Sequence, residues 1–197
     1  MKKQDLLSIF KIEDILDLPN AIENLLNGEI SKRDDVYIKL LELNSYDVSF
    51  DWFQKIYEED FAQRNQSKQD FTPNQVGVIL SKITGFEKGK IYEPTAGNGS
   101  LLISNWWQRC LKSDFPLMHF PSDHMIECWE LSNRAIPILL LNLSIRGIMG
   151  VVYHGDVLEK TVKQKYILLN RNNDTLGFSE IHKDSHNNLK IVENEYK

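Results

Sequence analysis

The first third of the chain repeats apolar residues at the three-to-four-residue spacing of amphipathic helices. Pro19 stands where a helix can begin, and Gly28 where it can end. Ser31 favours another helix start, and the aromatic run that follows Ser49 favours a fourth helix. We therefore predict an N-terminal helical subdomain over residues 1–66, in which the apolar positions serve packing.

After a polar stretch at residues 63–69, which we interpret as a linker, helical and strand-like patterns alternate. The predicted helices cover residues 72–84, 101–111 and 133–145, and the predicted strands cover residues 90–92, 125–129, 151–153 and 166–169. This alternation is typical of parallel strands joined by right-handed helical crossovers. We therefore predict an α/β domain over residues 67–197, with a doubly wound, mostly parallel sheet.

Polar or acidic residues follow each of the four predicted strands: Glu93, Glu130, Asp156 and Asn170. In open parallel sheets, ligands bind at the carboxyl ends of the strands, so these four positions are candidates for one site. Taken singly, Glu130 could be a solvated strand-end charge, and Asp156 could simply cap the following turn. Their occurrence in order on successive strand ends favours the site.

The turn after the first strand indicates the class of ligand. Gly97 and Gly99 allow the backbone to approach a ligand closely, and a new helix opens nearby with free N–H groups. Glu93 would repel a phosphate but could hold a cationic or hydroxyl-bearing ligand. The third glycine of a dinucleotide-binding fingerprint is replaced by Leu102. This pattern predicts an S-adenosylmethionine (SAM) site rather than a dinucleotide site.

Composition narrows the class further. The 197 residues are 42% hydrophobic and 26% charged, which is ordinary for a soluble globular protein. The net charge of -5 gives no overall attraction to nucleic acid. Cys110 and Cys128 lack metal-ligand spacing, so we expect reduced thiols and no metal site. No signal peptide or membrane-spanning run is recognised, which predicts a cytoplasmic protein without membrane contact.

Taken in order, several segments resemble the adenine-N6 DNA methyltransferases. The segments are residues 71–73 (Phe-Thr-Pro), residues 93–99, Glu130 and residues 155–158 (Gly-Asp-Val-Leu). The chain is most similar to the modification subunits of type I restriction-modification systems, over roughly residues 70–170. This resemblance implies a SAM-dependent methyltransferase-like (Rossmann-like) fold, DNA as a partner, and a possible specificity subunit, other restriction-modification subunit or homo-oligomer.

The resemblance also implies roles for individual residues. The implied cofactor site consists of Phe71, Thr72, Pro73, Glu93, Pro94, Gly97, Gly99, Glu130, Asp156 and Val157. Within it, residues 71–73 would cover the methionine end of SAM, and the turn after the first strand would form the methionine and sulfonium pocket. Glu130 would bind the ribose hydroxyls, and Asp156 the adenine of the cofactor.

The chain departs from the family pattern at the catalytic motif. These enzymes carry Asn or Asp, two prolines and an aromatic residue after the fourth strand, where the aromatic ring stacks on the extruded base. Here Asn170 falls at the amide position, but residues 171–173 are Arg-Asn-Asn. Only a short segment follows, with strand character at residues 188–192, so we expect incomplete C-terminal strands and no target-recognition domain.

Three other functions remain compatible with the sequence. The chain could be a catalytically inactive, methyltransferase-like protein that acts as a regulator or decoy in restriction-modification or phage defence. Methylation of RNA or of a protein amide would use the same type of site. A nicotinamide-dependent oxidoreductase is disfavoured because the diphosphate turn is wrong.

Overall fold

The computed structural model describes residues 1–57, 76–77, 79, 82–83, 89–112 and 119–184. The predicted linker at residues 63–69 and the strand-like residues 188–192 lie outside this set, as does most of the predicted helix over residues 72–84. The N-terminal helices are α1 (Lys3–Phe10), η1 (Ile15–Asp17), α2 (Leu18–Leu26), α3 (Ile30–Leu43) and α4 (Gln54–Tyr57). The helical character predicted for the N-terminal segment is confirmed for its described residues.

The remaining described residues form a five-stranded sheet and the helices that connect its strands. The strands are β1 (Ile91–Glu93), β2 (Ile126–Glu130), β3 (Gly150–Asp156), β4 (Thr161–Leu169) and β5 (Glu180–Asp184), in the spatial order β1-β2-β3-β4-β5. The helices are α6 (Ser100–Lys112), α7 (Ala135–Ser144) and the short η4 (Pro121–His124). The predicted α/β class is confirmed.

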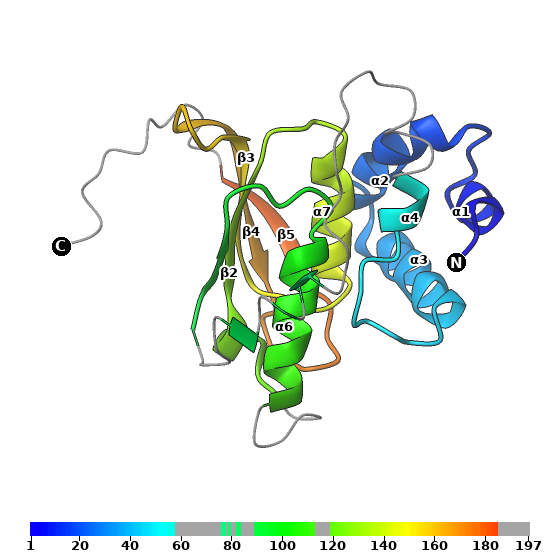
Figure 1. Cartoon of the computed structure of the whole chain (residues 1–197). Helices are drawn as coiled ribbons and strands as arrows, with labels where there is room; N and C mark the ends of the chain where they lie inside the picture. The colour runs from blue at the N-terminus through cyan, green and yellow to red at the C-terminus, as the bar shows by residue number, and fades with distance from the viewer. Residues whose placement is uncertain (58–75, 78, 80–81, 84–88, 113–118, 185–197) are drawn as a thin grey trace.

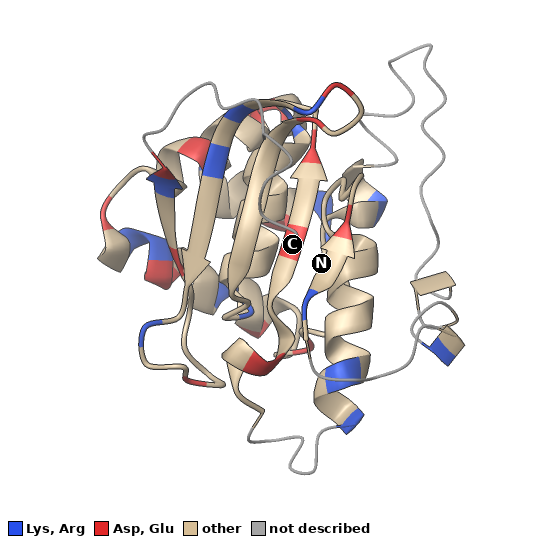
Figure 2. Ribbon diagram, turned by 90° about the vertical axis from the view of Figure 1, so that its left-hand side faces the viewer, with Lys and Arg blue, Asp and Glu red and all other residues tan. Residues whose placement is uncertain are grey.

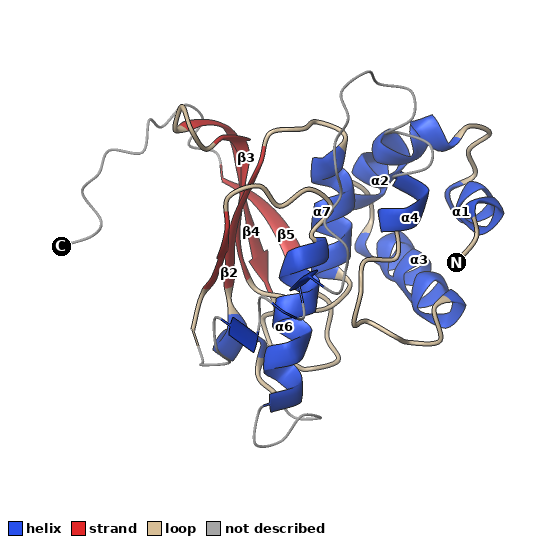
Figure 3. Ribbon diagram, in the orientation of Figure 1, coloured by secondary structure: helices blue, strands red, loops and turns tan. Residues whose placement is uncertain are grey.

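Helices α6 and α7 lie on the same face of the sheet (Figure 1). Strands β1, β2 and β3 are parallel and follow one another in a single direction across the sheet. Two right-handed crossovers that step in the same direction place both helices on one face. Figure 3 shows the resulting layers, with the sheet first, α6 and α7 next, and helices α1 to α4 beyond α7.

Every residue of α7 is buried, because the helix separates two hydrophobic cores. Leu139, Leu140 and Leu143 belong to the core under the sheet. Ile138 and Leu141 belong to the core formed with the N-terminal helices. A helix that is apolar all round needs neighbours on all sides, and this arrangement provides them. The N-terminal helices therefore pack directly onto the α/β part of the chain.

The fourth strand runs in the opposite direction to that expected. Strand β4 pairs with β3 in antiparallel fashion, with Val152 opposite Tyr166 and Asp156 opposite Thr161. Only residues 157–160 separate the two strands, whereas a parallel crossover needs a dozen or more residues. The predicted strands left residues 154–165 as the connection, which is much longer than the observed one, because β3 ends at Asp156 and β4 already begins at Thr161. The expectation of a fourth parallel strand was wrong.

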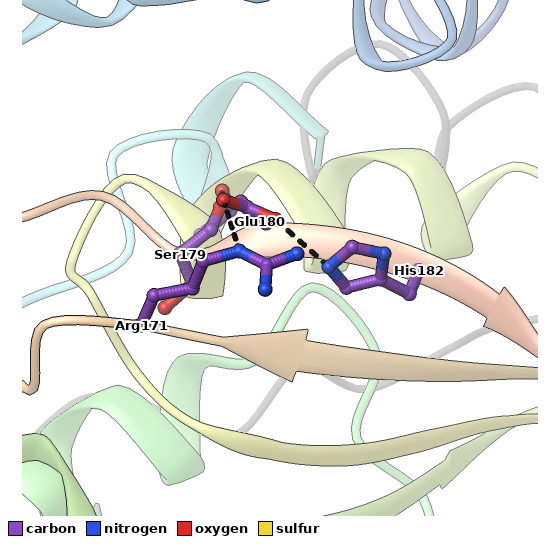
Figure 4. A network of polar contacts seen from close by, with 5 residues as sticks. Arg171, Ser179, Glu180 and His182 are labelled. Atoms are coloured by element: carbon purple, nitrogen blue, oxygen red, sulfur yellow. Dashed lines mark hydrogen bonds and ion pairs between the residues drawn. The ribbon is translucent and has the colours of Figure 1, made fainter.

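Strand β5, which the sequence pattern did not predict, pairs with β4 and covers its outer edge. Side-chain contacts of Ser179 and Glu180 hold the start of β5 in place. The Ser179 hydroxyl donates to the Ile148 carbonyl (2.8 Å). Figure 4 shows Glu180 between Arg171 and His182, with 2.8 Å to Arg171 Nε and 2.9 Å to His182 Nε2. The outer edge of β4 is therefore paired and not open.

The cysteines and the lengths of the helices were also subjects of prediction. Cys110 and Cys128 are buried, and neither forms a disulfide. Burial raises the pKa of the Cys110 thiol to about 12, so this side chain behaves as a packed apolar group. No helix in the described part of the chain has both the length and the apolar character needed to cross a bilayer.

Candidate functional site

The turn between β1 and α6 is built on two glycines with left-handed backbone. Gly97 has φ of 55° and Gly99 has φ of 93°, a region that other residues adopt at a cost. A Cβ on Gly97 would meet nothing within 4 Å, whereas a Cβ on Gly99 would lie 2.9 Å from Leu139 Cδ1. Gly97 thus leaves open space beside the turn, and Gly99 lets the turn pack against α7.

Glu93 stabilises the same turn from its start. Its Oε1 accepts hydrogen bonds from the Thr95 backbone N–H (3.2 Å) and the Thr95 hydroxyl (3.4 Å). The lining of the adjacent cavity begins one residue later, at Pro94. Glu93 therefore shapes the turn, and its contact with the methionine part of a cofactor stays a prediction.

Glu130, at the end of β2, connects two segments of the site. One carboxylate oxygen accepts from the Gly97 N–H (2.7 Å), and the other accepts from the Ser132 N–H (2.7 Å). A carboxylate has about four acceptor positions, so capacity for hydroxyl donors of a ligand remains. Figure 2 shows acidic residues at the arrow tips of neighbouring strands, where β1 and β2 end in Glu93 and Glu130.

Asp156 is the last residue of β3 and caps the hairpin that follows. Its Oδ1 accepts from the backbone N–H groups of Leu158 (2.9 Å) and Glu159 (3.1 Å). Capping does not remove Asp156 from the site, because Asp156 and Val157 both line the cavity. The capping role and the cavity position are thus both present in the structure.

The carboxyl ends of β1, β2 and β3 surround a single cavity of about 640 Å³. Its walls include Pro94, Thr95, Ala96, Gly97, Asn98, Ser100, Glu130, Leu131, Ser132, Asp156, Val157 and Leu158. Of the predicted site residues, the structure brings Pro94, Gly97, Glu130, Asp156 and Val157 together here. Gly99 does not line the cavity and faces α7 instead, and Phe71, Thr72 and Pro73 lie outside the described residues.

One wall of the cavity comes from the N-terminal segment, where the sequence pattern predicted packing residues alone. Asp51, Gln54 and Tyr57 all line the cavity. Gln54 Oε1 accepts a hydrogen bond from the Ser100 hydroxyl (2.8 Å), which joins α4 to the start of α6. The sequence feature that could have indicated this wall is Asp51, an acidic residue directly before the apolar pair Trp52 and Phe53.

Asp51 is the most buried acidic side chain of this wall, with 3% of its surface exposed. Its Oδ1 accepts from the Phe53 N–H (2.9 Å) and from Asn142 Nδ2 (2.8 Å). Burial raises the pKa of Asp51 to about 6, although these hydrogen bonds and the charge of Arg146 oppose the shift. Asp51 is therefore a carboxylate whose environment favours contact with a cation.

Asn170 does not reach this cavity. Because β4 is antiparallel to β3, its carboxyl end lies beside Gly150, at the end of β3 opposite to Asp156. The Asn170 side chain is buried and holds the following loop, donating to the carbonyls of Asp174 (2.7 Å) and Gly177 (3.1 Å). The direction of β4 therefore separates Asn170 from the cavity, and its assignment as a catalytic residue stays a prediction.

The residues present fit SAM as the occupant. A cavity of about 640 Å³ lies within the range of small-molecule sites. Gly97 leaves room where a side chain would protrude, and α6 begins at Ser100 beside the turn with the free N–H groups of a helix N-terminus. Asp51 offers an acceptor to a cation, while Glu130 and Asp156 offer acceptors to hydroxyl and amino donors.

Comparison with known proteins gives the family. A Listeria monocytogenes protein described as a class I S-adenosylmethionine-dependent methyltransferase matches 86% of this chain at 16% identity, with a TM-score of 0.49. The chain spans 61% of the length of that protein. No curated protein sequence matches the chain. The family model for N-6 DNA methylases matches residues 48–184, which is more than half of the chain. The chain therefore belongs to the N-6 DNA methylase family, whose methyl donor is S-adenosylmethionine.

Proposed function

We propose that this protein binds SAM as part of an adenine-N6 DNA methyltransferase of the restriction-modification type. The observation that supports this function most directly is the cavity at the carboxyl ends of β1, β2 and β3. It brings the Gly97 turn, Glu130 and Asp156 to one place, in the order in which a sulfonium nucleoside would need them. Family membership supplies the reaction class.

Two of the contacts that the family resemblance implies have candidate residues in this cavity. Glu130, already held by the Gly97 and Ser132 N–H groups, is oriented to accept from the ribose hydroxyls. Asp156, at the end of the neighbouring strand, would accept from the adenine amino group. Fixed hydrogen bonds keep both carboxylates in place before the ligand arrives, which lowers the entropic cost of binding.

Methyl transfer depends on holding the donor sulfonium in line with the target nitrogen and on excluding water. The cavity has apolar residues at its exposed rim, because Leu131 is 52% exposed and Leu158 is 92% exposed. We assign this rim to the side from which the methyl acceptor approaches. Asn170 lies at the opposite end of the sheet, so activation of the adenine amino group falls to other residues.

A second function deserves a test because of Asn170. The amide that should bind the target base instead holds its own loop, and the segment that follows it is Arg171, Asn172 and Asn173. A protein with this change could bind SAM without transferring the methyl group, and act as a regulator or decoy in a restriction-modification complex. Other subunits, or a second copy, could then supply the base-binding residues.

Tritium transfer from labelled SAM to DNA separates these two functions. We expect little transfer by the isolated chain, and transfer that appears when partner subunits supply the base-binding residues. SAM binding without transfer under any of these conditions would favour the regulator. If the tritium label is found in RNA or protein and not in DNA, the methyl acceptor is RNA or protein and the proposed DNA substrate is wrong.

The proposed partners of the protein are DNA and a further subunit of a restriction-modification complex. Similarity to type I modification subunits suggests DNA and a specificity subunit as partners. The net charge of -5 means that the chain lacks overall attraction to DNA, so a partner subunit would provide most of the phosphate contacts. Measurement of DNA affinity with and without such a subunit tests this assignment.

A further inference from the structure

Two side chains of the cavity wall carry polar atoms without hydrogen-bond partners in the described structure. They are Asp51, which is 3% exposed, and Asn98, which is 5% exposed. Asp51 Oδ2 has no partner, and neither does Oδ1 or Nδ2 of Asn98. Both residues line the cavity. A buried polar atom left unpaired costs about 1–3 kcal/mol, so the pair calls for a specific explanation.

One nitrogen holds the two residues next to each other. Asn142 Nδ2, on α7, donates to Asp51 Oδ1 (2.8 Å) and to the Asn98 carbonyl (2.9 Å). Arg146 donates to the Asn142 side-chain oxygen (3.1 Å), which fixes the orientation of the amide. Asp51 and Asn98 are thus placed together by a buried network and are not independent surface groups.

The unpaired atoms define the ligand by their chemistry. A carboxylate oxygen such as Asp51 Oδ2 only accepts, so it needs a donor and is best satisfied by a cation. The Asn98 amide has a free N–H donor, which suits an anion, and a free acceptor. A cation and an anion side by side are the two groups of an α-amino acid.

The position of the pair matches one end of the proposed cofactor. Asn98 belongs to the turn that precedes α6, a helix of 13 residues whose N-terminus attracts a negative charge. Gln54, one turn from Asp51, bonds to Ser100 in the first turn of that helix. Glu130 and Asp156 lie on the neighbouring strand ends, where the nucleoside would sit. The pair therefore faces the amino-acid end.

We propose that Asp51 accepts a hydrogen bond from the α-ammonium group of SAM, and that Asn98 donates to its α-carboxylate. This inference rests on the SAM site proposed above and adds two residues to it. Asp51 is then the residue that distinguishes a complete amino-acid cofactor from a bare nucleoside. The buried network of Asn142 and Arg146 positions Asp51 without touching the ligand.

Calorimetry with three ligands tests the assignment. SAM and S-adenosylhomocysteine (SAH) carry the α-ammonium group, whereas 5′-methylthioadenosine keeps the nucleoside and lacks the amino acid. We expect Asp51→Asn to weaken SAM and SAH binding at least tenfold and to leave methylthioadenosine binding within twofold of wild type. Asp35→Asn, which removes an exposed carboxylate that does not line the cavity, is the matched control and should change none of the three affinities.

The outcomes separate this inference from the proposed function. If the wild-type protein binds neither SAM nor SAH, the proposed function fails. If it binds both, but Asp51→Asn changes nothing or weakens all three ligands equally, only the role of Asp51 is overturned. Should Asp51→Asn fail to fold, SAH is compared with its deaminated analogue on the wild-type protein, and Asn98→Ala is compared with wild type for SAH. The proposal is supported if the deaminated analogue binds more weakly than SAH and if Asn98→Ala binds SAH more weakly than wild type does. Equal affinities in these comparisons overturn it.

Discussion

Asp51 is a carboxylate with almost no contact with water, and its charge is compensated only in part. Its pKa of about 6 in the folded protein lies above its ordinary value of 3.8. The folded state therefore binds more protons than the unfolded state between these two values. The free energy of unfolding should fall as the pH rises through that window. Above about pH 6 the full cost of the buried charge is present.

Replacement of Asp51 by Asn removes this titration while keeping the acceptor for Asn142. We expect Asp51→Asn to be more stable than wild type at pH 7 by about 1–3 kcal/mol, and to show little difference near pH 4. Urea unfolding of both proteins from pH 4 to 7 measures the difference. A variant that is less stable at pH 7 would mean that Asp51 serves the fold and not a ligand.

The two glycines of the turn should respond differently to alanine. Gly99→Ala combines a strained φ with a contact to Leu139, so we expect a loss of about 1–3 kcal/mol in stability. Gly97→Ala should lose only about 1 kcal/mol, because the added methyl group meets open space, and should mainly weaken SAM binding. Thermal unfolding and SAM titration of both variants check this contrast, which equal effects on both measurements would contradict.

At the scale of elements, α7 connects the sheet, the N-terminal helices and the cavity. Arg146, two residues after its end, donates to the carbonyls of Val48 (2.9 Å) and Phe50 (2.6 Å). Its guanidinium lies 4.4 Å from the ring centre of Trp52. These contacts hold the segment that carries Asp51. A polar network on an otherwise apolar helix thus sets one wall of the site.

Arg146→Met should loosen that wall. The change leaves buried carbonyls without donors, so we expect a loss of about 2–5 kcal/mol in stability together with weaker SAM binding. Arg134→Met, at the exposed start of α7, removes the same charge without these contacts and should be close to neutral. The account would be contradicted if Arg146→Met unfolded at the same urea concentration as wild type.

A substitution at Asn170 tests whether β4 runs antiparallel to β3, because this direction keeps Asn170 away from the cavity. Its side chain accepts from the Asp174 N–H (3.0 Å) and donates to two carbonyls of the same loop. We expect Asn170→Ala to lower stability by about 1–3 kcal/mol and to leave SAM affinity unchanged. A large loss of SAM affinity in a folded Asn170→Ala protein would return this residue to the site.

The sequence was sufficient for the elements with strong local signals. The Gly97 turn, the end of β2 and the apolar helix over residues 133–145 follow from patterns a few residues long. The predicted strand over residues 151–153 lies within β3 but stops before its end at Asp156. The direction of β4 did not follow, because Thr161 to Lys165 contain a single apolar residue, Val162, and therefore gave no signal that the strand begins at Thr161. Asp51 was missed because its role arises from contacts with α7, some 90 residues later.

On the scale of the whole molecule, the candidate cofactor site is lined by both parts of the chain. The sheet supplies the Gly97 turn, Glu130 and Asp156, and the N-terminal segment supplies Asp51 and Tyr57. The family match begins at residue 48, so it includes this last segment before the sheet. Helix α4 and the residue Asp51 just before it therefore complete one wall of the cavity.

The most direct test of the central claim is a calorimetric titration of SAM into the wild-type protein and Asp156→Ala, with NAD as the competing cofactor. We predict binding of one SAM per chain, no comparable binding of NAD, and SAM affinity at least tenfold lower in Asp156→Ala. Tight binding of NAD without SAM, or unchanged SAM affinity in Asp156→Ala, would contradict the assignment of this cavity as a SAM site.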